Sequence, residues 1–253
     1  MITIDRVTIR AGDFHLENAS LSVPTGSYAV LMGRTGSGKT SLLEAVAGLK
    51  TIVSGRIFLG DRDVTACTPA ERHIGYVPQD GALFEHMNVR EHLAFALKIR
   101  KAAPSHIAHR VEHLAGMLEI EPLLSRSIHG LSGGEKQRVQ LARVLAQIWE
   151  PVADHARVLI LDEPTSSFDL AHQQLTIANM RSFAAQGVGV LVVIHDLNMA
   201  ARCADQLLVL SCGRIAACGS PQQVLTATTI KQVFNVDVSI GINPLTGTPL
   251  VIA

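Results

Sequence analysis

One octapeptide near the start of the sequence has the residue types and spacing of a phosphate-binding loop. Residues 33–40 fit the pattern Gly, any four residues, Gly-Lys and then Ser or Thr, between a strand-like and a helix-like segment. Glycines let backbone N–H groups turn towards phosphate oxygens, and the N-terminus of the following helix adds its positive dipole end. The sequence therefore predicts a nucleotide site. Its loop consists of Gly33, Arg34, Thr35, Gly36, Ser37, Gly38, Lys39 and Thr40.

Two side chains of this loop have predicted roles of their own. Lys39 is placed to reach the β- and γ-phosphates of the nucleotide, and the hydroxyl of Thr40 is placed to ligate Mg²⁺. The alternative is a glycine-rich turn that binds nothing. The complete pattern and its two flanking segments favour the nucleotide site.

A pair of carboxylates follows an apolar strand later in the chain. The strand reads Val-Leu-Ile-Leu over residues 158–161, and Asp162 and Glu163 come directly after it. Such a run is typical of a strand buried on both faces, and ligands bind at the carboxyl ends of strands in an open α/β sheet. We therefore expect Asp162 to hold Mg²⁺, directly or through water, and Glu163 to accept a proton from an attacking water.

Two further polar residues follow predicted strands. Gln79 comes after a strand at residues 74–77, where its side chain could meet Mg²⁺ or the attacking water. His195 ends an apolar strand at residues 190–194 and could touch the γ-phosphate. Either residue alone would be interpreted as a surface or structural side chain. Together with the phosphate loop and the two carboxylates, both are candidates for one catalytic site.

A second anion site is predicted at the start of another helix. The serine hydroxyl and the glycine amides of this segment would face an anion at the helix N-terminus. A helical insert separates it from the phosphate loop of the same chain, so one nucleotide cannot easily contact both. The sequence therefore predicts a homodimer in which two copies enclose each nucleotide. The segment consists of Ser132, Gly133, Gly134 and Glu135.

Strands alternate with helices through much of the chain, which indicates the α/β class with a mostly parallel sheet. Before the phosphate loop, alternating and β-branched residues predict antiparallel strands at residues 2–10 and 16–23. After it, Pro69 is predicted to start a short turn.

The middle of the chain has a different periodicity. Apolar residues recur at helical spacing over a predicted helical insert at about residues 88–150, in which Pro122 is expected to close the second helix. We expect a single domain, residues 1–253, with a C-terminal helix and hairpin extension at about residues 221–253.

Bulk composition argues against several classes of protein. Lys+Arg and Asp+Glu both total 22, and proteins that bind nucleic acid usually carry a basic excess, so no nucleic-acid partner is expected. No apolar run approaches the ~18 residues of a membrane span, and the first residues lack a signal-peptide layout. The four cysteines have no C-x-x-C spacing, so neither a zinc site nor a disulfide framework is indicated.

The order of these motifs resembles that of the ATP-binding cassette (ABC) family. The resemblance covers the chain from about residue 2 to its end, and it implies ATP hydrolysis with Mg²⁺. It also implies the ABC ATPase fold, a RecA-like P-loop core with an N-terminal antiparallel β-subdomain and a helical signature subdomain. The motifs that carry it are the phosphate loop, Gln79, Leu-Ser-Gly-Gly-Glu at 131–135, Val-Leu-Ile-Leu-Asp-Glu-Pro at 158–164, Ser-Ser-Phe-Asp at 166–169, and His195.

The resemblance assigns roles to three residues. Gln79 matches the Q-loop residue that links the nucleotide to a transmembrane partner. Asp169 matches the D-loop acid at the nucleotide interface, and His195 matches the switch histidine.

Two positions depart from the family pattern. The family usually places an adenine-stacking aromatic where this chain has Ala11, although Phe14 is close in sequence. The D-loop has Ser167 and Phe168 where Ala-Leu is commoner, and the bulkier Phe168 is expected to alter dimer packing.

The sequence also indicates which kind of ABC protein this is. A single cassette without membrane spans resembles importer subunits, which lie on the cytoplasmic face of the cell (inner) membrane. They work with two transmembrane permease subunits and a substrate-binding protein. The C-terminal third resembles the ATPases of iron-chelate, haem and cobalamin importers, and residues 145–151 resemble the haem-import ATPase.

Other functions remain open at this stage. Residues 84–101 are more similar to molybdate or tungstate importer subunits, so those anions are an alternative cargo to haem. An alternative of another class is a soluble ABC ATPase that acts on nucleic acid or ribosomes.

Overall fold

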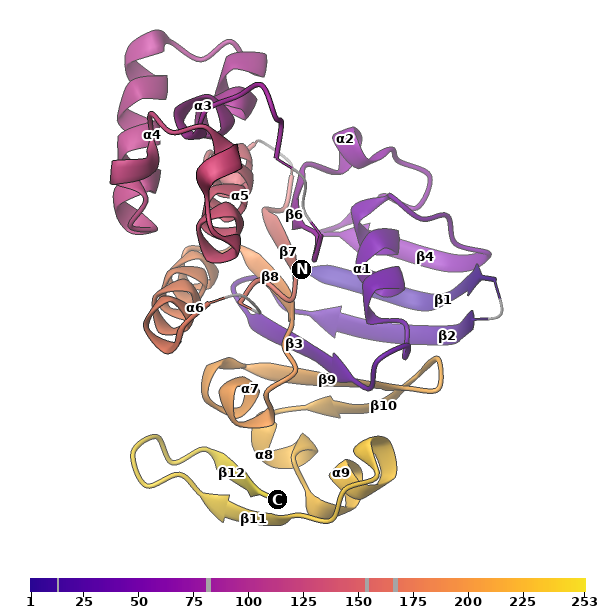
Figure 1. Cartoon of the computed structure of the whole chain (residues 1–253). Helices are drawn as coiled ribbons and strands as arrows, with labels where there is room; N and C mark the ends of the chain where they lie inside the picture. Colours follow the sequence, from indigo (N-terminus) through magenta and orange to yellow (C-terminus); the bar gives the residue numbers. More distant parts are fainter. Residues whose placement is uncertain (13, 81–82, 153–154, 166–167) are drawn as a thin grey trace.

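A six-stranded sheet forms the centre of the molecule (Figure 1). The computed structural model describes residues 1–12, 14–80, 83–152, 155–165 and 168–253. The strand order is β10-β9-β3-β8-β7-β6, and all neighbours are parallel except β9 and β10. Every residue of β3, β7 and β8 is buried, as their apolar composition predicts. The strands are β3 (Tyr28–Gly33), β6 (Ile74–Val77), β7 (Val158–Asp162), β8 (Gly189–Val193), β9 (Gln206–Ser211) and β10 (Arg214–Gly219).

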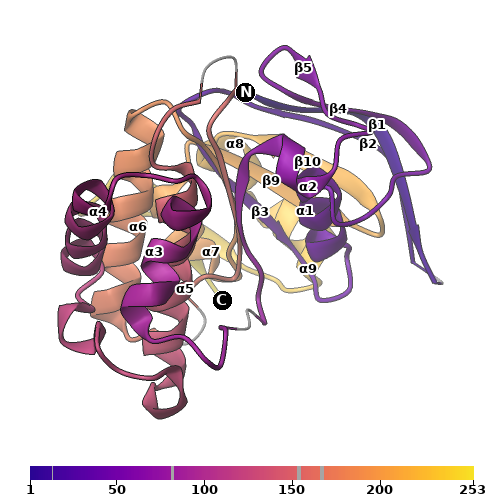
Figure 2. The ribbon, with the colours of Figure 1, turned by 90° about the horizontal axis from the view of Figure 1, so that it is seen from above.

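A smaller antiparallel sheet covers one face of this core. Its strand order is β2-β1-β4-β5, and the helix α1 (Lys39–Ala47) packs between the two sheets (Figure 2). Residues of both sheets and of α1 share one buried cluster, so the helix after the phosphate loop is fixed from two sides. The strands are β1 (Ile2–Ala11), β2 (Phe14–Val23), β4 (Ser54–Leu59) and β5 (Arg62–Asp63), which confirms the two predicted N-terminal strands.

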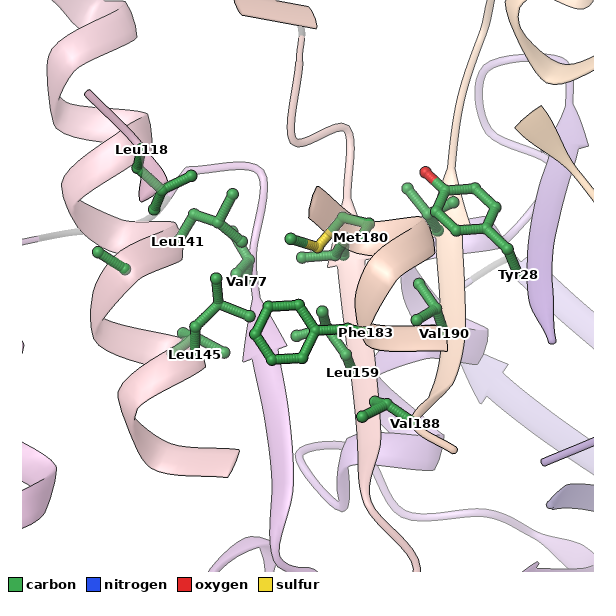
Figure 3. Close-up of a cluster of buried hydrophobic side chains, with 14 of the residues drawn as sticks. Tyr28, Val77, Leu118, Leu141, Leu145, Leu159, Met180, Phe183, Val188 and Val190 are labelled. Carbon is green, nitrogen blue, oxygen red and sulfur yellow. The ribbon is translucent and has the colours of Figure 1, made fainter. Parts of the chain in front are cut away.

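Helices cover the opposite face of the large sheet. Figure 3 shows part of their shared core, where Leu141 and Leu145 of α5 lie near Met180 and Phe183 of α6 and near the sheet residue Val77. Because α5 is anchored in this core, its N-terminus is held in a fixed relation to the sheet. The elements are α3 (Val89–Ile99), α4 (Pro104–Met117), η1 (Glu121–Leu123), η2 (Ile128–Gly130), α5 (Gly133–Ile148) and α6 (Leu170–Ala185).

Two predictions at prolines were wrong. Pro69 begins a short helix, α2 (Pro69–Arg72), because Thr68 and Glu71 form a capping box and proline is favourable at the first helical position. Pro122 does not close α4, which ends at Met117, before Glu119 adopts a left-handed conformation with φ 54°. The proline lies at the start of η1 instead, where its missing N–H costs nothing.

The histidine at the start of α3 gives the helical region a predicted pH dependence. His92 is fully buried, its Nε2 accepts from the N–H of Phe84 at 2.8 Å, and its Nδ1 lies 2.8 Å from the carbonyl oxygen of Asn88. Burial lowers the pKa of His92 below its ordinary value of 6.5. The unfolded chain therefore binds this proton more readily, and the free energy of unfolding falls as the pH drops below 6.5.

We expect urea unfolding to give a smaller free energy of unfolding at pH 5.5 than at pH 7.5. In His92→Ala the difference between the two pH values should be smaller than in the wild type. At pH 7.5 the substitution should cost about 1–3 kcal/mol, because it leaves the N–H of Phe84 without its buried acceptor. The control His109→Ala changes an exposed histidine and should leave the free energy of unfolding at each pH near that of the wild type. An unchanged pH dependence in His92→Ala would show that other groups cause it.

The C-terminal region wraps the edge of the sheet near β9 and β10 (Figure 1). It ends in a separate two-stranded hairpin that packs against α7. None of the described helices is both long and apolar enough to cross a membrane. The elements are α7 (Leu197–Cys203), α8 (Pro221–Val224), α9 (Ala227–Phe234), β11 (Ser239–Ile242) and β12 (Pro249–Ile252).

Candidate nucleotide site

The register of the large sheet brings the sequence motifs to one edge. Val193 of β8 lies beside Asp162 of β7 on one side and beside Leu31 of β3 on the other. The residues that follow these three parallel strands therefore meet where ligands bind in open α/β sheets. Together with Gln79 after β6 and Phe14 at the start of β2, they line a cavity of about 480 Å³. It is lined by Phe14, Thr35, Gly36, Gly38, Lys39, Thr40, Ser41, Gln79, Glu163 and His195.

The phosphate loop has the geometry of an anion site. Gly36 and Gly38 have φ of 76° and 100°, values that L side chains rarely adopt. Helix α1 begins directly after Gly38, and none of the side chains that the structure describes caps its N-terminus. The first N–H groups of the helix have no intrahelical acceptor, so they are available to bind phosphate oxygens.

Lys39 is held inside this loop. Its side chain is buried, and Nζ donates to the carbonyl oxygens of Gly33 at 3.0 Å and Arg34 at 3.1 Å. Burial lowers the pKa of Lys39, while the negative charges of Glu163 and Asp162 act in the opposite direction. Carbonyl groups orient the ammonium but do not neutralise it, so this position favours an anionic ligand.

Asp162 and Thr40 form the next layer of the site. The hydroxyl of Thr40 donates to Asp162 Oδ2 at 2.7 Å, and the carboxylate is 1 % exposed. Among the described residues, nothing donates a hydrogen bond to Asp162 Oδ1. Burial raises the pKa of Asp162 and the charge of Glu163 adds to this, although the Thr40 hydrogen bond works against it. A buried carboxylate oxygen without a donor, beside a hydroxyl, fits a hard cation such as Mg²⁺, which takes oxygen ligands.

Glu163 lies at the centre of the predicted catalytic group. Its Oε1 is 2.5 Å from His195 Nε2, and its Oε2 accepts from Gln79 Nε2 at 3.4 Å. The backbone of Glu163 has φ 51°, which is rare for a residue other than glycine and typical of functional sites. The structure thus brings together Gln79, Glu163 and His195, which the sequence placed at the ends of three separate strands.

The second predicted anion site lies at a separate cavity of about 390 Å³. At the N-terminus of α5, Glu135 N–H donates to Ser132 Oγ at 3.3 Å, and Ser132 N–H donates to Glu135 Oε2 at 2.7 Å. This capping box uses the N–H groups of Ser132 and Glu135, and not the Ser132 hydroxyl hydrogen or the glycine amides that the sequence assigned to an anion. The described lining consists of Ser132, Gly133, Gly134, Glu135, Arg138, Phe168, Asp169 and His172.

Asp169 caps a helix beside the same cavity. Its Oδ1 accepts from the N–H of His172 at 2.9 Å at the start of α6, and this bond lowers the pKa of Asp169. Phe168 is buried next to it, so the bulky D-loop residue packs inward. Ser166 and Ser167 lie outside the described residues, as does the side chain of Ala11.

Two residues at the nucleotide site had no role assigned to them from the sequence. Gln137 donates from Nε2 to the main-chain carbonyl oxygen of Glu163 at 3.0 Å, which links α5 to the backbone of the predicted catalytic residue. The available signal was a polar residue just after Ser132–Glu135, but many exposed helix positions share it. Phe14, noted in the sequence only as an aromatic near Ala11, lies over the phosphate loop. Its ring carbons are 2.1–3.1 Å from the position that a Cβ on Gly38 would occupy.

Phe14 is the aromatic side chain in the described wall of this cavity, and we predict that it contributes to nucleotide affinity. Phe14→Ala should weaken ATP binding by about 5- to 150-fold, since the contact of a base with an aromatic ring contributes about 1–3 kcal/mol. Equilibrium binding of a fluorescent ATP analogue measures this. Phe58→Ala, which removes a β4 ring packed under Arg56, serves as the control. Equal affinities of Phe14→Ala and the wild type would exclude the contact.

Comparison with known proteins relates this geometry to a family. A family profile described as "ABC transporter" matches residues 16–166, more than half of the chain. The chain is 39% identical to the "Hemin import ATP-binding protein HmuV" of Mesorhizobium japonicum, and the match covers 90% of this chain and 88% of that protein.

Other matches widen the range of relatives. The chain is 40% identical to the "sn-glycerol-3-phosphate import ATP-binding protein UgpC" of Cupriavidus necator, over 81% of this chain but only 54% of that one. Among solved structures, the fold is similar to that titled "Dimeric Structure of MJ0796, a Bacterial ABC Transporter Cassette". The TM-score is 0.78, with 24% identity and coverage of 87% of this chain and 99% of that chain.

Proposed function

The chain belongs to the ABC transporter family, and we propose that it is the ATP-hydrolysing subunit of an importer of hemin. Membership confirms the family and the fold that the motif order predicted. The observation that supports hydrolysis is the contact of Glu163 with His195 beside an intact phosphate loop.

The geometry of the described residues supports a hydrolytic site with the following roles. The N–H groups at the start of α1 and the ammonium of Lys39 would bind the phosphates of ATP. Glu163 would accept the proton of the attacking water, and His195 would hold that carboxylate and contact the γ-phosphate. Gln79 reaches the same carboxylate and would sense whether the site is filled.

Mg²⁺ fits the oxygens beside the phosphate loop. The Thr40 hydroxyl and Asp162 Oδ1, which accepts no hydrogen bond from the described residues, would hold it, directly or through water, and Gln79 would join them. When bound, Mg²⁺ neutralises charge on the phosphate oxygens. The Thr40 hydroxyl alone donates to this carboxylate among the described side chains, so a cation would add a second partner for its buried charge.

Each nucleotide is proposed to lie between two copies of the chain. The phosphate loop and the Ser132–Glu135 segment line different cavities of one chain, so a single copy presents two half-sites. A second copy turned to face the first would place its Ser132–Glu135 segment over the bound ATP, with Asp169 at the same interface. The hydroxyl hydrogen of Ser132 remains available for a phosphate, because the capping box uses the oxygen only as an acceptor.

The permease contact is proposed at an apolar groove next to the Gln79 segment. The groove has a volume of about 500 Å³ and lies between β6 and the helices α3 and α5. Aromatic rings of Tyr76, Phe84 and Phe95 line it, and Ile99 at its rim is 65 % exposed. An apolar permease helix suits such a groove, and its binding would hold the chain at the cytoplasmic face of the membrane as a peripheral subunit. Two permease subunits, one for each copy, and a substrate-binding protein complete the proposed importer.

Hemin is the preferred cargo because the similarity to hemin import proteins extends along nearly the whole of both chains. The glycerol-3-phosphate relative is equally identical, but the chain covers only about half of it. Molybdate or tungstate remains the alternative cargo suggested by residues 84–101.

Growth of the source organism tests the cargo. A strain without this chain should fail to grow with hemin as its sole iron source and should recover with the wild-type chain but not with Glu163→Gln. Growth with ferric salts is the control for general fitness. Normal growth on hemin, together with loss of molybdate-dependent enzyme activity, would overturn the hemin assignment in favour of the alternative.

A further inference from the structure

The C-terminal hairpin is joined to the helix that follows His195. Strand β12 packs against α7, and the side chain of Asn198 makes two hydrogen bonds to the main chain of Val251. Asn198 Nδ2 donates to the carbonyl oxygen at 3.0 Å, and Asn198 Oδ1 accepts from the N–H at 2.7 Å. The Asn198 amide group therefore holds Val251 of β12 both as a donor and as an acceptor.

Helix α7 connects this contact to the catalytic group. It begins at Leu197, two residues after His195, and Asp196 caps it by accepting from the N–H of Met199 at 2.8 Å. A helix of seven residues is not stable alone, so its position depends on the elements that pack against it. Its inner face is buried towards the sheet, and β12 covers another part of its surface.

The hairpin depends on α7 in the same way. A two-stranded hairpin is marginally stable by itself, and β11 is largely exposed. The apolar side chains of Ile242 in β11 and Leu245 in the hairpin turn are 76 % and 92 % exposed, so their burial contributes little to the stability of the hairpin. The Asn198 hydrogen bonds and the packing of β12 are thus contacts that hold the hairpin and α7 together.

We propose that Asn198 is a positioning residue for ATP hydrolysis: by fixing α7 to β12, it holds His195 against Glu163. The 2.5 Å contact between the two side chains tolerates little movement, because a shift of about 1 Å takes the pair out of hydrogen-bond range. A misplacement of that size can lower a rate by up to about 100-fold. The inference rests on the proposed function, since it takes Glu163 and His195 as the hydrolytic pair.

Two variants remove hydrogen bonds between α7 and β12, one by a change in each element. Asn198→Ala removes both hydrogen bonds from α7, and Val251→Pro removes the N–H donor from β12. We expect each to lower kcat for ATP about 10-fold and to leave KM within about twofold, because neither touches the phosphate loop. The control Asn179→Ala removes a similar bond, from Nδ2 to the carbonyl oxygen of Met117 at 2.9 Å, away from the site, and should keep the wild-type kcat.

The decisive measurement combines the variants with His195→Ala. If Asn198 acts through His195, adding Asn198→Ala to His195→Ala should cause no further loss of kcat. A further 10-fold loss in the double variant, or a wild-type kcat in Asn198→Ala, would overturn the proposal. Should Asn198→Ala fail to fold, Val251→Pro with and without His195→Ala answers the same question.

The same assay separates the role of His195 from the role of Asn198. If His195→Ala keeps the wild-type kcat, the proposed role of His195 fails, and the positioning role fails with it. If His195→Ala loses activity while Asn198→Ala and Val251→Pro do not, only the positioning role is wrong.

Discussion

Glu163→Gln is expected to lower ATP turnover by about 10²- to 10⁴-fold, the range for loss of a general base. The amide has nearly the shape of the carboxylate, so the contact with Gln79 should remain, as should the hydrogen bond that Gln137 donates to the main-chain carbonyl of residue 163. The amide cannot, however, accept a proton from water. The affinity for ATP should change little, because the phosphate loop is untouched. Phosphate release under saturating Mg-ATP, with ATP affinity measured separately, checks both statements.

A matched control isolates the catalytic effect. Glu112→Gln makes the same chemical change at an exposed carboxylate, whose partner is Arg90 at 2.7 Å, and should retain wild-type turnover. If Glu163→Gln hydrolyses ATP as fast as Glu112→Gln, Glu163 is not the base and the catalytic assignment is wrong.

Gly38→Ala should weaken ATP binding by at least about 100-fold. Two physical effects act together. Position 38 has φ 100°, which costs a residue with a Cβ about 1–3 kcal/mol, and the new Cβ would lie 2.1 Å from Cζ of Phe14. Either the ring or the loop must move, and the N–H groups that are proposed to bind the phosphates would move with the loop. Isothermal titration calorimetry with Mg-ATP measures the change in affinity.

Two other glycines separate these effects. Gly36→Ala has the backbone cost at φ 76° but no atom within 4 Å of the new Cβ, so its loss should be smaller. Gly130→Ala has open space without the unusual φ and should bind ATP like the wild type. In a Gly38→Ala, Phe14→Ala double variant this overlap is absent, so the loss of binding free energy should be smaller than the sum of the losses in the two single variants. Equal affinities of Gly38→Ala and Gly130→Ala would contradict the geometry of the loop.

The fold could be predicted from the sequence because its strongest signals are local. The phosphate loop, the buried strand before Asp162 and the helix after Ser132 are each set by neighbouring residues. The order of these motifs then indicated the family. The prediction of a turn at Pro69 was wrong because capping by Thr68 starts a short helix there. The prediction that Pro122 ends a helix was wrong because the left-handed Glu119 lies just after the helix end and before the proline.

Side-chain partners across long sequence distances could not be predicted in this way. The sequence placed His195 near a γ-phosphate, whereas the structure shows its contact with Glu163, which depends on the register of β7 and β8. Gln137 and Asn198 were missed for the same reason. Their partners lie 26 and 53 residues away, and neither spacing follows a helical or strand period. Only the packing of α5 and β12 brings these pairs together.

Two copies of the chain are proposed to enclose each ATP before hydrolysis. Light scattering of Glu163→Gln after gel filtration, with and without Mg-ATP, can detect this dimer, because the variant should keep its nucleotide unhydrolysed. We predict the mass of one chain, 27.1 kDa, without nucleotide and twice that mass with ATP. Ser132→Arg in the same background should stay at the mass of one chain. A mass of 27.1 kDa for Glu163→Gln with ATP bound would contradict the two-copy site.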